Sequence, residues 1–122
     1  MTPNSSIIKS FEYALSGLGF AIVNNRNMQI HTIAAILVLI LSFVFKIQRV
    51  EFIALVVMIV LVMSAEMINT SIEEMTNLIT SEHRKEAKIA KDVSAGMVLV
   101  VSIGAAVVGV YILFPYAINL LH

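Results

Sequence analysis

The sequence contains no cysteine and no tryptophan, and it has only two prolines and five glycines among its 122 residues. The lack of cysteine excludes disulfide bonds and thiolate chemistry. Charged residues make up 13% of the chain and the net charge is zero, so no excess of one sign draws nucleic acid. The run Gly17-Leu18-Gly19 lacks the spaced glycines and the Lys-Ser/Thr end of a phosphate loop. The sequence also contains no signature motif of a soluble protein kinase or a zinc-binding protein.

Apolar residues dominate what is present. They account for 59% of the chain, and the mean hydropathy is +0.94. A soluble domain of this size still exposes much of its surface and could not hide so many apolar side chains. We therefore predict an all-α membrane protein that forms a single domain over residues 1–122.

Three apolar runs are long enough to cross a bilayer, which needs about 20 helical residues. They predict spans over residues 28–47, 50–79 and 93–121, and Pro115 is expected to end or kink the third. Residues 7–23 carry apolar side chains at spacings of three and four and are too polar to span. We expect them to form an amphipathic helix in the membrane interface. Residues 80–92 are expected to form a charged loop.

The basic residues predict how the chain is oriented. With a cytoplasmic N-terminus, most of them lie on the cytoplasmic side: Lys9, Arg26, Arg84, Lys85, Lys88 and Lys91. Only Lys46 and Arg49 lie on the other side. This bias favours a cytoplasmic N-terminus and an external C-terminus.

Four polar side chains share one strip of the second span. Taking Glu66 as reference, Asn69, Glu73 and Asn77 lie at about −60°, −20° and +20° around a helix that advances 100° per residue. A carboxylate among hydrocarbon costs about 2.5 kcal/mol or more, so such groups usually face a wet cavity, a metal or a partner. Glu66 suits a base that accepts an alcohol proton, and Glu73, nearer the water, suits a divalent cation.

Other polar residues have plainer interpretations beside functional ones. Asn69, Thr70 and Ser71 can each serve as hydrogen-bonding contacts between membrane helices. Glu74 lies about 100° away from Glu73 and is interpreted as an interfacial charge. His31 is interpreted as an ordinary interfacial histidine. The pair Lys91-Asp92 stands level with Glu73, where it could meet phosphates, although such lysines also act as topology signals.

Several runs resemble one known family in order along nearly the whole chain. They are Ser10-Phe11-Glu12-Tyr13-Ala14, Arg26-Asn27-Met28-Gln29-Ile30-His31, Glu66-Met67-Ile68-Asn69-Thr70-Ser71-Ile72-Glu73 and Ala87-Lys88-Ile89-Ala90-Lys91-Asp92-Val93-Ser94-Ala95-Gly96. The chain thereby resembles the prokaryotic diacylglycerol kinase family, which consists of small three-span lipid kinases. The likeness is stronger to the undecaprenol kinase branch than to the diacylglycerol branch.

The resemblance implies a homotrimer in a bacterial plasma membrane that moves the γ-phosphoryl group of ATP to a lipid hydroxyl with Mg²⁺. It implies that Glu66 is the catalytic base, that Asn69 orients it, and that Ala95 and Glu66 contact the lipid. It also implies that Glu73 holds Mg²⁺, with Asn25 as a second metal position. The residues that the resemblance assigns to the nucleotide are Tyr13, Asn25, Glu73, Glu82, His83, Arg84, Lys91 and Asp92.

The sequence departs from the family pattern at two positions. Asn25 stands where a glutamate is common and Asn77 where an aspartate is usual, and an amide oxygen is a weaker ligand for Mg²⁺. The leading hypothesis is an undecaprenol kinase. The alternatives are a diacylglycerol kinase that makes phosphatidic acid, a weak or regulatory homologue, and a proton-coupled transporter. The transporter is disfavoured because residues 52–63 of the second span offer no polar path.

Overall fold

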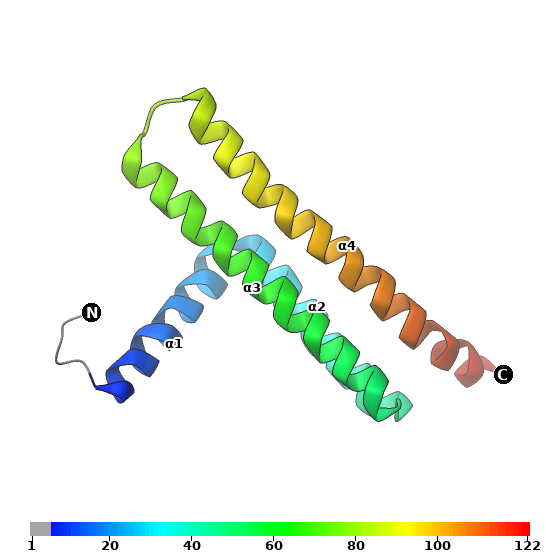
Figure 1. The fold of residues 1–122 in the computed structure, drawn as a ribbon. Coiled ribbons are helices and arrows are strands. Elements are labelled where there is room, and N and C mark those ends of the chain that lie inside the picture. Colours follow the sequence, from blue (N-terminus) through cyan, green and yellow to red (C-terminus); the bar gives the residue numbers. More distant parts are fainter. Residues whose placement is uncertain (1–5) are drawn as a thin grey trace.

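The computed structural model describes residues 6–122, a range in which the chain forms four helices and no strand. The helices are α1 (Ile7–Asn24), α2 (Arg26–Phe45), α3 (Arg49–Ile79) and α4 (Lys85–Leu121). Figure 1 shows α3 and α4 as a long hairpin, α2 behind α3, and α1 leaving the bundle at a steep angle. The predicted all-α class is confirmed.

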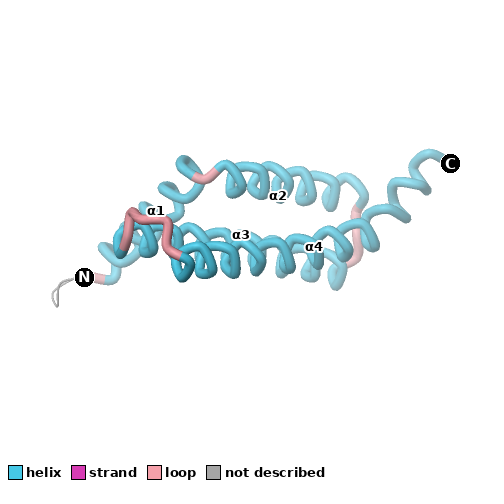
Figure 2. The backbone as a smooth tube through the Cα atoms, turned by 90° about the horizontal axis from the view of Figure 1, so that it is seen from above, coloured by secondary structure: helices cyan, strands magenta, loops and turns pink. Residues whose placement is uncertain are grey.

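The two ends of the bundle differ. At one end α3 and α4 run past the α1–α2 junction to the short connection between them, and we call this the loop end (Figure 1). The opposite end, the far end, holds the α2–α3 turn and the end of α4. Seen from above, α2 lies apart from the overlapping α3 and α4 (Figure 2), so the three long helices form a triangular bundle.

Helices α2, α3 and α4 are each long and apolar enough to cross a membrane. Their most apolar windows have mean hydropathies of 2.3, 2.3 and 2.6, yet only 11%, 22% and 6% of the residues in those windows are buried. Most residues of these windows therefore keep part of their apolar surface exposed. A soluble monomer does not expose apolar surface on that scale, whereas a lipid environment favours it.

Local capping interactions set the helix ends. The side chain of Ser6 accepts a hydrogen bond from the backbone of Lys9 at 3.2 Å and caps α1. Lys46 ends α2 in the left-handed conformation, with φ 52° and ψ 52°. The backbone N–H of Gln48 donates to the Glu51 side chain at 3.0 Å as α3 begins.

Helix α4 is longer than the sequence predicted. It begins at Lys85, so residues 85–92, expected as loop, are helical. Alanine and lysine favour helix there, and an ion pair between Lys88 and Asp92, one turn apart, spans 2.5 Å. The helix also continues through Pro115 to Leu121. Beyond the proline, the ring of Tyr116 stacks on Phe45, which holds the last turns in place.

Four of the buried residues are polar: Ser42, Glu66, Asn69 and Ser94. Ser42 donates its hydroxyl to the carbonyl of Val38 on its own helix, so it is locally satisfied. The other three lie on α3 and α4, in the half of the bundle nearer the loop end. The fold therefore concentrates its buried polarity in one place.

Candidate functional site

Asn25 is the single residue between α1 and α2, and its side chain forms hydrogen bonds with α2 and α3. The side-chain oxygen accepts hydrogen bonds from the backbone N–H groups of Asn27 at 2.9 Å and Met28 at 3.2 Å, which caps α2. The side-chain amide donates to Thr70 Oγ1 at 2.8 Å and to Glu66 Oε2 at 3.2 Å. The start of α2 is thereby tied to α3 beside a carboxylate.

Glu66 is the most deeply buried charged residue described, with 1% of its surface exposed. Its Oε2 atom accepts the bond from Asn25. Its Oε1 atom lies 3.3 Å from Nε2 of His31, outside hydrogen-bond geometry, and has no hydrogen-bond partner among residues 6–122. Buried polar atoms without a partner are uncommon in folded proteins. One oxygen of Glu66 is therefore held by Asn25, and the other lies against the imidazole of His31 without a hydrogen bond.

Asn69 joins α3 to α4 one turn further toward the loop end. The hydroxyl of Ser94 donates to Asn69 Oδ1 at 2.8 Å, and Asn69 Nδ2 donates to Glu73 Oε1 at 3.2 Å. Asn69 and Ser94 are buried, whereas Glu73 is exposed. The amide of Asn69 is thus fixed at both ends, and it presents Glu73 at the edge of the bundle.

The polar strip runs from the interior of the bundle to its surface. Glu66 and Asn69 are buried, whereas Glu73 and Asn77 are exposed. Glu66 and Asn77 are about 16 Å apart along the helix axis at 1.5 Å per residue. The strip therefore links a shielded carboxylate to an open polar surface at the loop end.

A groove of about 710 Å³ lies at the loop end, and we call it the loop-end groove. Lys91 Nζ donates to Asn77 Oδ1 there at 2.8 Å, and Arg84 Nε lies 3.2 Å from Glu82 Oε2. The exposed Arg84 and the half-buried Lys91 both line this space, and such cations form strong hydrogen bonds with phosphates. The groove is lined by Thr76, Asn77, Thr80, Ser81, Glu82, His83, Arg84, Lys85, Ala87, Lys88, Lys91 and Asp92.

Most of the residues expected to bind the nucleotide meet in this groove. Glu82, His83, Arg84, Lys91 and Asp92 all line it. Tyr13, the expected nucleotide residue on α1, does not line this groove. Helix α1 makes no contact with α4 within the described range.

Tyr13 is 55% exposed. Ala95, the expected lipid contact, is also exposed. A single chain therefore leaves both residues exposed, and neither lines the loop-end groove.

The described residues do not form a metal-binding cage by themselves. Across residues 6–122, no three histidine or acidic side chains come close enough together to hold a metal ion. Glu73 offers a single carboxylate, and Asn25 bonds to Glu66 and Thr70 rather than to Glu73. Protein-bound Mg²⁺ often takes only one or two carboxylates and fills its other positions with phosphate oxygens and water. The donor set fits an ion delivered with a nucleotide better than a preformed metal cage.

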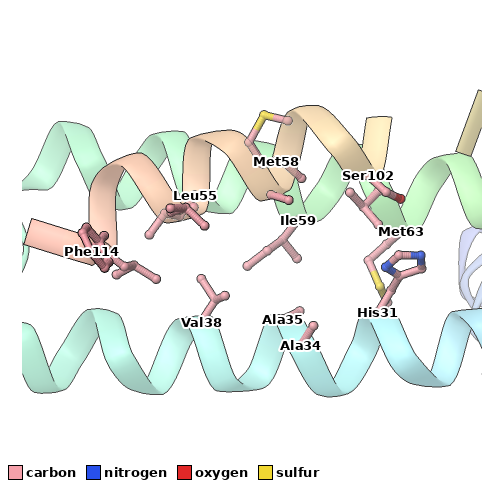
Figure 3. Close-up of a pocket in the computed structure, with 16 residues that line it drawn as sticks. His31, Ala34, Ala35, Val38, Leu55, Met58, Ile59, Met63, Ser102 and Phe114 are labelled. Atoms are coloured by element: carbon pink, nitrogen blue, oxygen red, sulfur yellow. The ribbon is translucent and has the colours of Figure 1, made fainter. Parts of the chain in front are cut away.

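An apolar cavity of about 500 Å³ lies between α2, α3 and α4 and reaches the residue beside Glu66. Figure 3 shows His31, Met63 and Ser102 toward one end of it and Leu55 and Phe114 toward the other. His31 is the residue whose ring lies 3.3 Å from Glu66 Oε1. The cavity is lined by His31, Ala34, Ala35, Val38, Leu55, Met58, Ile59, Val62, Met63, Ser102, Ala105, Ala106, Gly109, Val110, Leu113 and Phe114.

Sequence reasoning gave His31 and Ser94 no role, although both touch the polar strip. His31 was interpreted as an interfacial residue, yet it lies on the carboxylate of Glu66. A functional role of His31 could have been predicted, because an ionisable residue in an apolar span is a functional candidate by default. Ser94 gave no comparable signal, since small hydroxyl residues are common contacts between membrane helices.

Comparison with known proteins gives consistent matches. The family described as prokaryotic diacylglycerol kinase matches residues 12–113, which include all the candidate site residues. An undecaprenol kinase of Bacillus subtilis is 36% identical over 107 residues, covering 88% of this chain and 87% of the relative.

Two further relatives have a different name. A diacylglycerol kinase of Synechocystis sp. is 34% identical over 122 residues, covering 99% of this chain and 69% of the relative. A diacylglycerol kinase of Escherichia coli strain K12 is 26% identical over 110 residues, covering 90% of each chain. The two enzyme names thus occur at 36% and 34% identity, with a second diacylglycerol kinase at 26%.

Proposed function

This chain belongs to the prokaryotic diacylglycerol kinase family and is a membrane lipid kinase, and from that premise we propose that it phosphorylates undecaprenol to undecaprenyl phosphate with ATP. The acceptor hydroxyl would attack the γ-phosphorus, ADP would leave, and the hydroxyl proton would pass to a protein base. Phosphoryl transfer of this kind asks the protein mainly for positioning and charge stabilisation.

The state of Glu66 is the observation that carries the proposal. Its Oε1 atom is buried, free of hydrogen bonds and next to His31 at the end of the apolar cavity, while Asn25 holds Oε2. A base must lie within hydrogen-bond reach of the proton that it takes. A lipid whose chain occupied the cavity would bring its hydroxyl toward this oxygen. Glu66 is therefore the proposed base, and Asn69, fixed by Ser94, orients the strip beside it.

The loop-end groove is the proposed nucleotide site. Arg84, Lys88 and Lys91 line it and would neutralise phosphate charge, while Glu82, His83 and Asp92 would contact the rest of the nucleotide. Glu73 stands between this groove and Glu66 on α3, about 10 Å from Glu66 along the helix axis. The γ-phosphate would thus approach the acceptor along the polar strip.

Glu73 is the proposed Mg²⁺ ligand. The ion, when bound, would neutralise charge on the nucleotide phosphates. Asn69 holds Oε1 of Glu73 at 3.2 Å, which orients the carboxylate for that task. The second metal position, Asn25, would act through Glu66 instead, since its amide donates there.

Similarity supports two acceptors in nearly equal measure. The relative at 36% identity is an undecaprenol kinase, and this likeness makes undecaprenol the first choice. Diacylglycerol is the second candidate because the relative at 34% identity, which matches 99% of this chain, is a diacylglycerol kinase. A weak or regulatory homologue is the third, because amides at Asn25 and Asn77 replace the acidic residues usual in the family.

The proposed assembly is a homotrimer in a bacterial plasma membrane, with the N-terminus in the cytoplasm. The large outward apolar surface of α2, α3 and α4 supports contact with lipid and with other subunits. Tyr13 and Ala95, which one chain leaves exposed, would then complete sites formed with a neighbouring subunit.

The test is phosphate transfer from ATP to undecaprenol and, separately, to diacylglycerol in mixed micelles with Mg²⁺. Glu66→Gln is compared with Glu74→Gln, since Glu74 lies on the same helix but is exposed. We expect Glu66→Gln to lower the rate by about 10²–10⁴-fold, the usual contribution of a general base, and Glu74→Gln to change it little.

Each outcome of that assay is informative. A product that depends on Glu66 supports the kinase, and the ratio of the two rates identifies the acceptor. Failure of the wild type on both lipids, at high Mg²⁺ and with Mn²⁺, refutes the proposed catalysis and favours the regulatory homologue. A Glu66→Gln rate equal to that of the wild type assigns the base to another residue.

A further inference from the structure

Ser102 is an exception among the hydroxyl groups of α2, α3 and α4 that are shielded from solvent, because it has no hydrogen-bond partner in the described chain. Thr32, Ser42, Thr70 and Thr76 each donate to the backbone carbonyl one turn earlier, at 2.7–3.0 Å. Ser102 makes no such bond, and its oxygen is shielded from solvent without a hydrogen-bond partner in the described chain. An unpaired hydroxyl in apolar surroundings is destabilising, so its orientation calls for a partner outside the protein.

The surroundings of Ser102 show what kind of partner would fit. It lines the apolar cavity between α2, α3 and α4, at the end where His31 and Met63 lie (Figure 3). Besides Ser102, the only lining side chain with a nitrogen or oxygen atom is that of His31, next to Glu66. A hydrocarbon chain would fill the cavity but would leave the hydroxyl of Ser102 unpaired. A hydrogen-bond acceptor carried within the lipid would satisfy it.

The distance between Ser102 and Glu66 along the bundle suits a lipid that carries a hydrogen-bond acceptor near its reacting hydroxyl. The contact between Ser94 and Asn69 sets a common level on α4 and α3. At 1.5 Å per residue, Ser102 lies about 12 Å from this level toward the far end, and Glu66 lies about 4.5 Å from it in the same direction. The two therefore differ in depth by about 7.5 Å. That separation is comparable to the reach of a glycerol unit with one attached ester carbonyl. An isoprenoid chain carries no such carbonyl.

We propose that the cavity within one subunit holds the part of the acceptor lipid that lies next to its hydroxyl. In this cavity Ser102 is a specificity-determining residue, which donates a hydrogen bond to an ester carbonyl of a glycerolipid. This inference rests on the proposed function, and within it on the second candidate acceptor, diacylglycerol, because undecaprenol has no ester carbonyl. Ser102 would set the ratio at which the enzyme uses diacylglycerol and undecaprenol, without touching the reacting atoms.

The decisive experiment compares 1,2-diacylglycerol with the matched 1,2-dialkylglycerol, whose ether links lack the carbonyl. Both are assayed beside undecaprenol for wild type, Ser102→Ala, Ser102→Thr and Ser42→Ala. The Ser42 hydroxyl is buried but bonded to its own helix and does not line the cavity, so Ser42→Ala controls for loss of a buried hydroxyl.

We expect Ser102→Ala to lower kcat/KM for the ester lipid by about 2–10-fold, as loss of one hydrogen bond predicts. The ether lipid and undecaprenol should change little, so the preference for ester over ether falls. Ser102→Thr should keep the preference, and Ser42→Ala should leave it unchanged. Equal effects of Ser102→Ala on ester and ether lipids, or no effect on either, would overturn the proposal.

A binding readout separates this inference from the proposed function. A photoreactive diacylglycerol is crosslinked to the full chain in micelles, with unlabelled diester or diether lipid as competitor. Labelling of α4 around Ser102 that the diester displaces better than the diether supports the cavity site, even if no lipid is phosphorylated. Labelling confined to the outer surface, or displaced equally by both competitors, would refute it.

Discussion

The side-chain amide of Asn25 donates a hydrogen bond to Oε2 of Glu66 at 3.2 Å, which ties the α1–α2 junction to the carboxylate that α3 buries. The resemblance in sequence had suggested that Asn25 weakens a metal site, because the family pattern implies a glutamate at this position. In the structure the amide does what a carboxylate could not, since it donates to Glu66 and to Thr70. A glutamate held at this point would place two negative charges together.

The first prediction concerns this pair. Asn25→Asp keeps the side-chain oxygen that caps α2 but replaces the donor with a second carboxylate. Hydrogen bonds to charged groups contribute about 1.5–3 kcal/mol, so we expect the rate of lipid phosphorylation to fall by about 10–100-fold. The control is Asn24→Asp, because the exposed Asn24 amide bonds only to the carbonyl of Phe20 on its own helix. A higher rate in Asn25→Asp, with tighter Mg²⁺ binding, would restore the metal-ligand interpretation.

The second prediction concerns the contact between Ser94 and Asn69. Ser94→Ala leaves Oδ1 of the buried Asn69 without its donor, which should lower the free energy of unfolding by about 1–3 kcal/mol. The rate of phosphorylation should fall as well, because Asn69 loses its anchor on α4. Denaturant titration in detergent measures the first effect and the micelle assay the second. Ser71→Ala, at an exposed position of α3, should be neutral in both.

The third prediction concerns the loop-end groove. Lys91→Gln removes the cation that donates to Asn77 and should raise KM for ATP by about 3–10-fold, with a smaller change in kcat. The difference from wild type should shrink at high salt, because exposed charges are screened. Lys46→Gln removes a cation at the far end and serves as the control. Equal effects of the two substitutions would argue that Lys91 contributes only net charge.

The fourth prediction separates stability from activity. Tyr116 donates its hydroxyl to Glu51 at the far end, which joins α4 to the start of α3. We expect Tyr116→Phe to lower the thermal midpoint in detergent, because a hydrogen bond to a carboxylate is lost, and to leave KM and kcat unchanged. Tyr111→Phe is the matched control, since that ring is 83% exposed. A large loss of kcat in Tyr116→Phe would mean that the far end takes part in the reaction.

The fifth prediction concerns orientation in the membrane. The chain has no cysteine, so single cysteines introduced as Gln48→Cys and Glu82→Cys can be labelled without background. With a cytoplasmic N-terminus, a membrane-impermeant maleimide should label the first variant in intact spheroplasts and the second only after lysis. The opposite pattern would place the loop-end groove outside the cell, away from cytoplasmic ATP, and would contradict the proposed topology.

The sequence by itself determined the features that depend on local pattern. Length and hydropathy predicted three helices able to span a membrane, and the structure has them. Helical periodicity placed Glu66, Asn69, Glu73 and Asn77 on one strip, because position around a helix follows from residue number alone. Local rules were weakest at the α3–α4 connection, where strong helix formers extended α4 into the expected loop.

Only the tertiary structure decided which residues meet across helices. Asn25 and Glu66 are 41 residues apart, and Ser94 and Asn69 are 25 apart, so no sequence spacing could pair them. The same holds for the apolar cavity that brings His31 and Ser102 together from α2 and α4. Helix packing alone turns Glu66 into a buried carboxylate with one oxygen bonded to Asn25 and the other against His31.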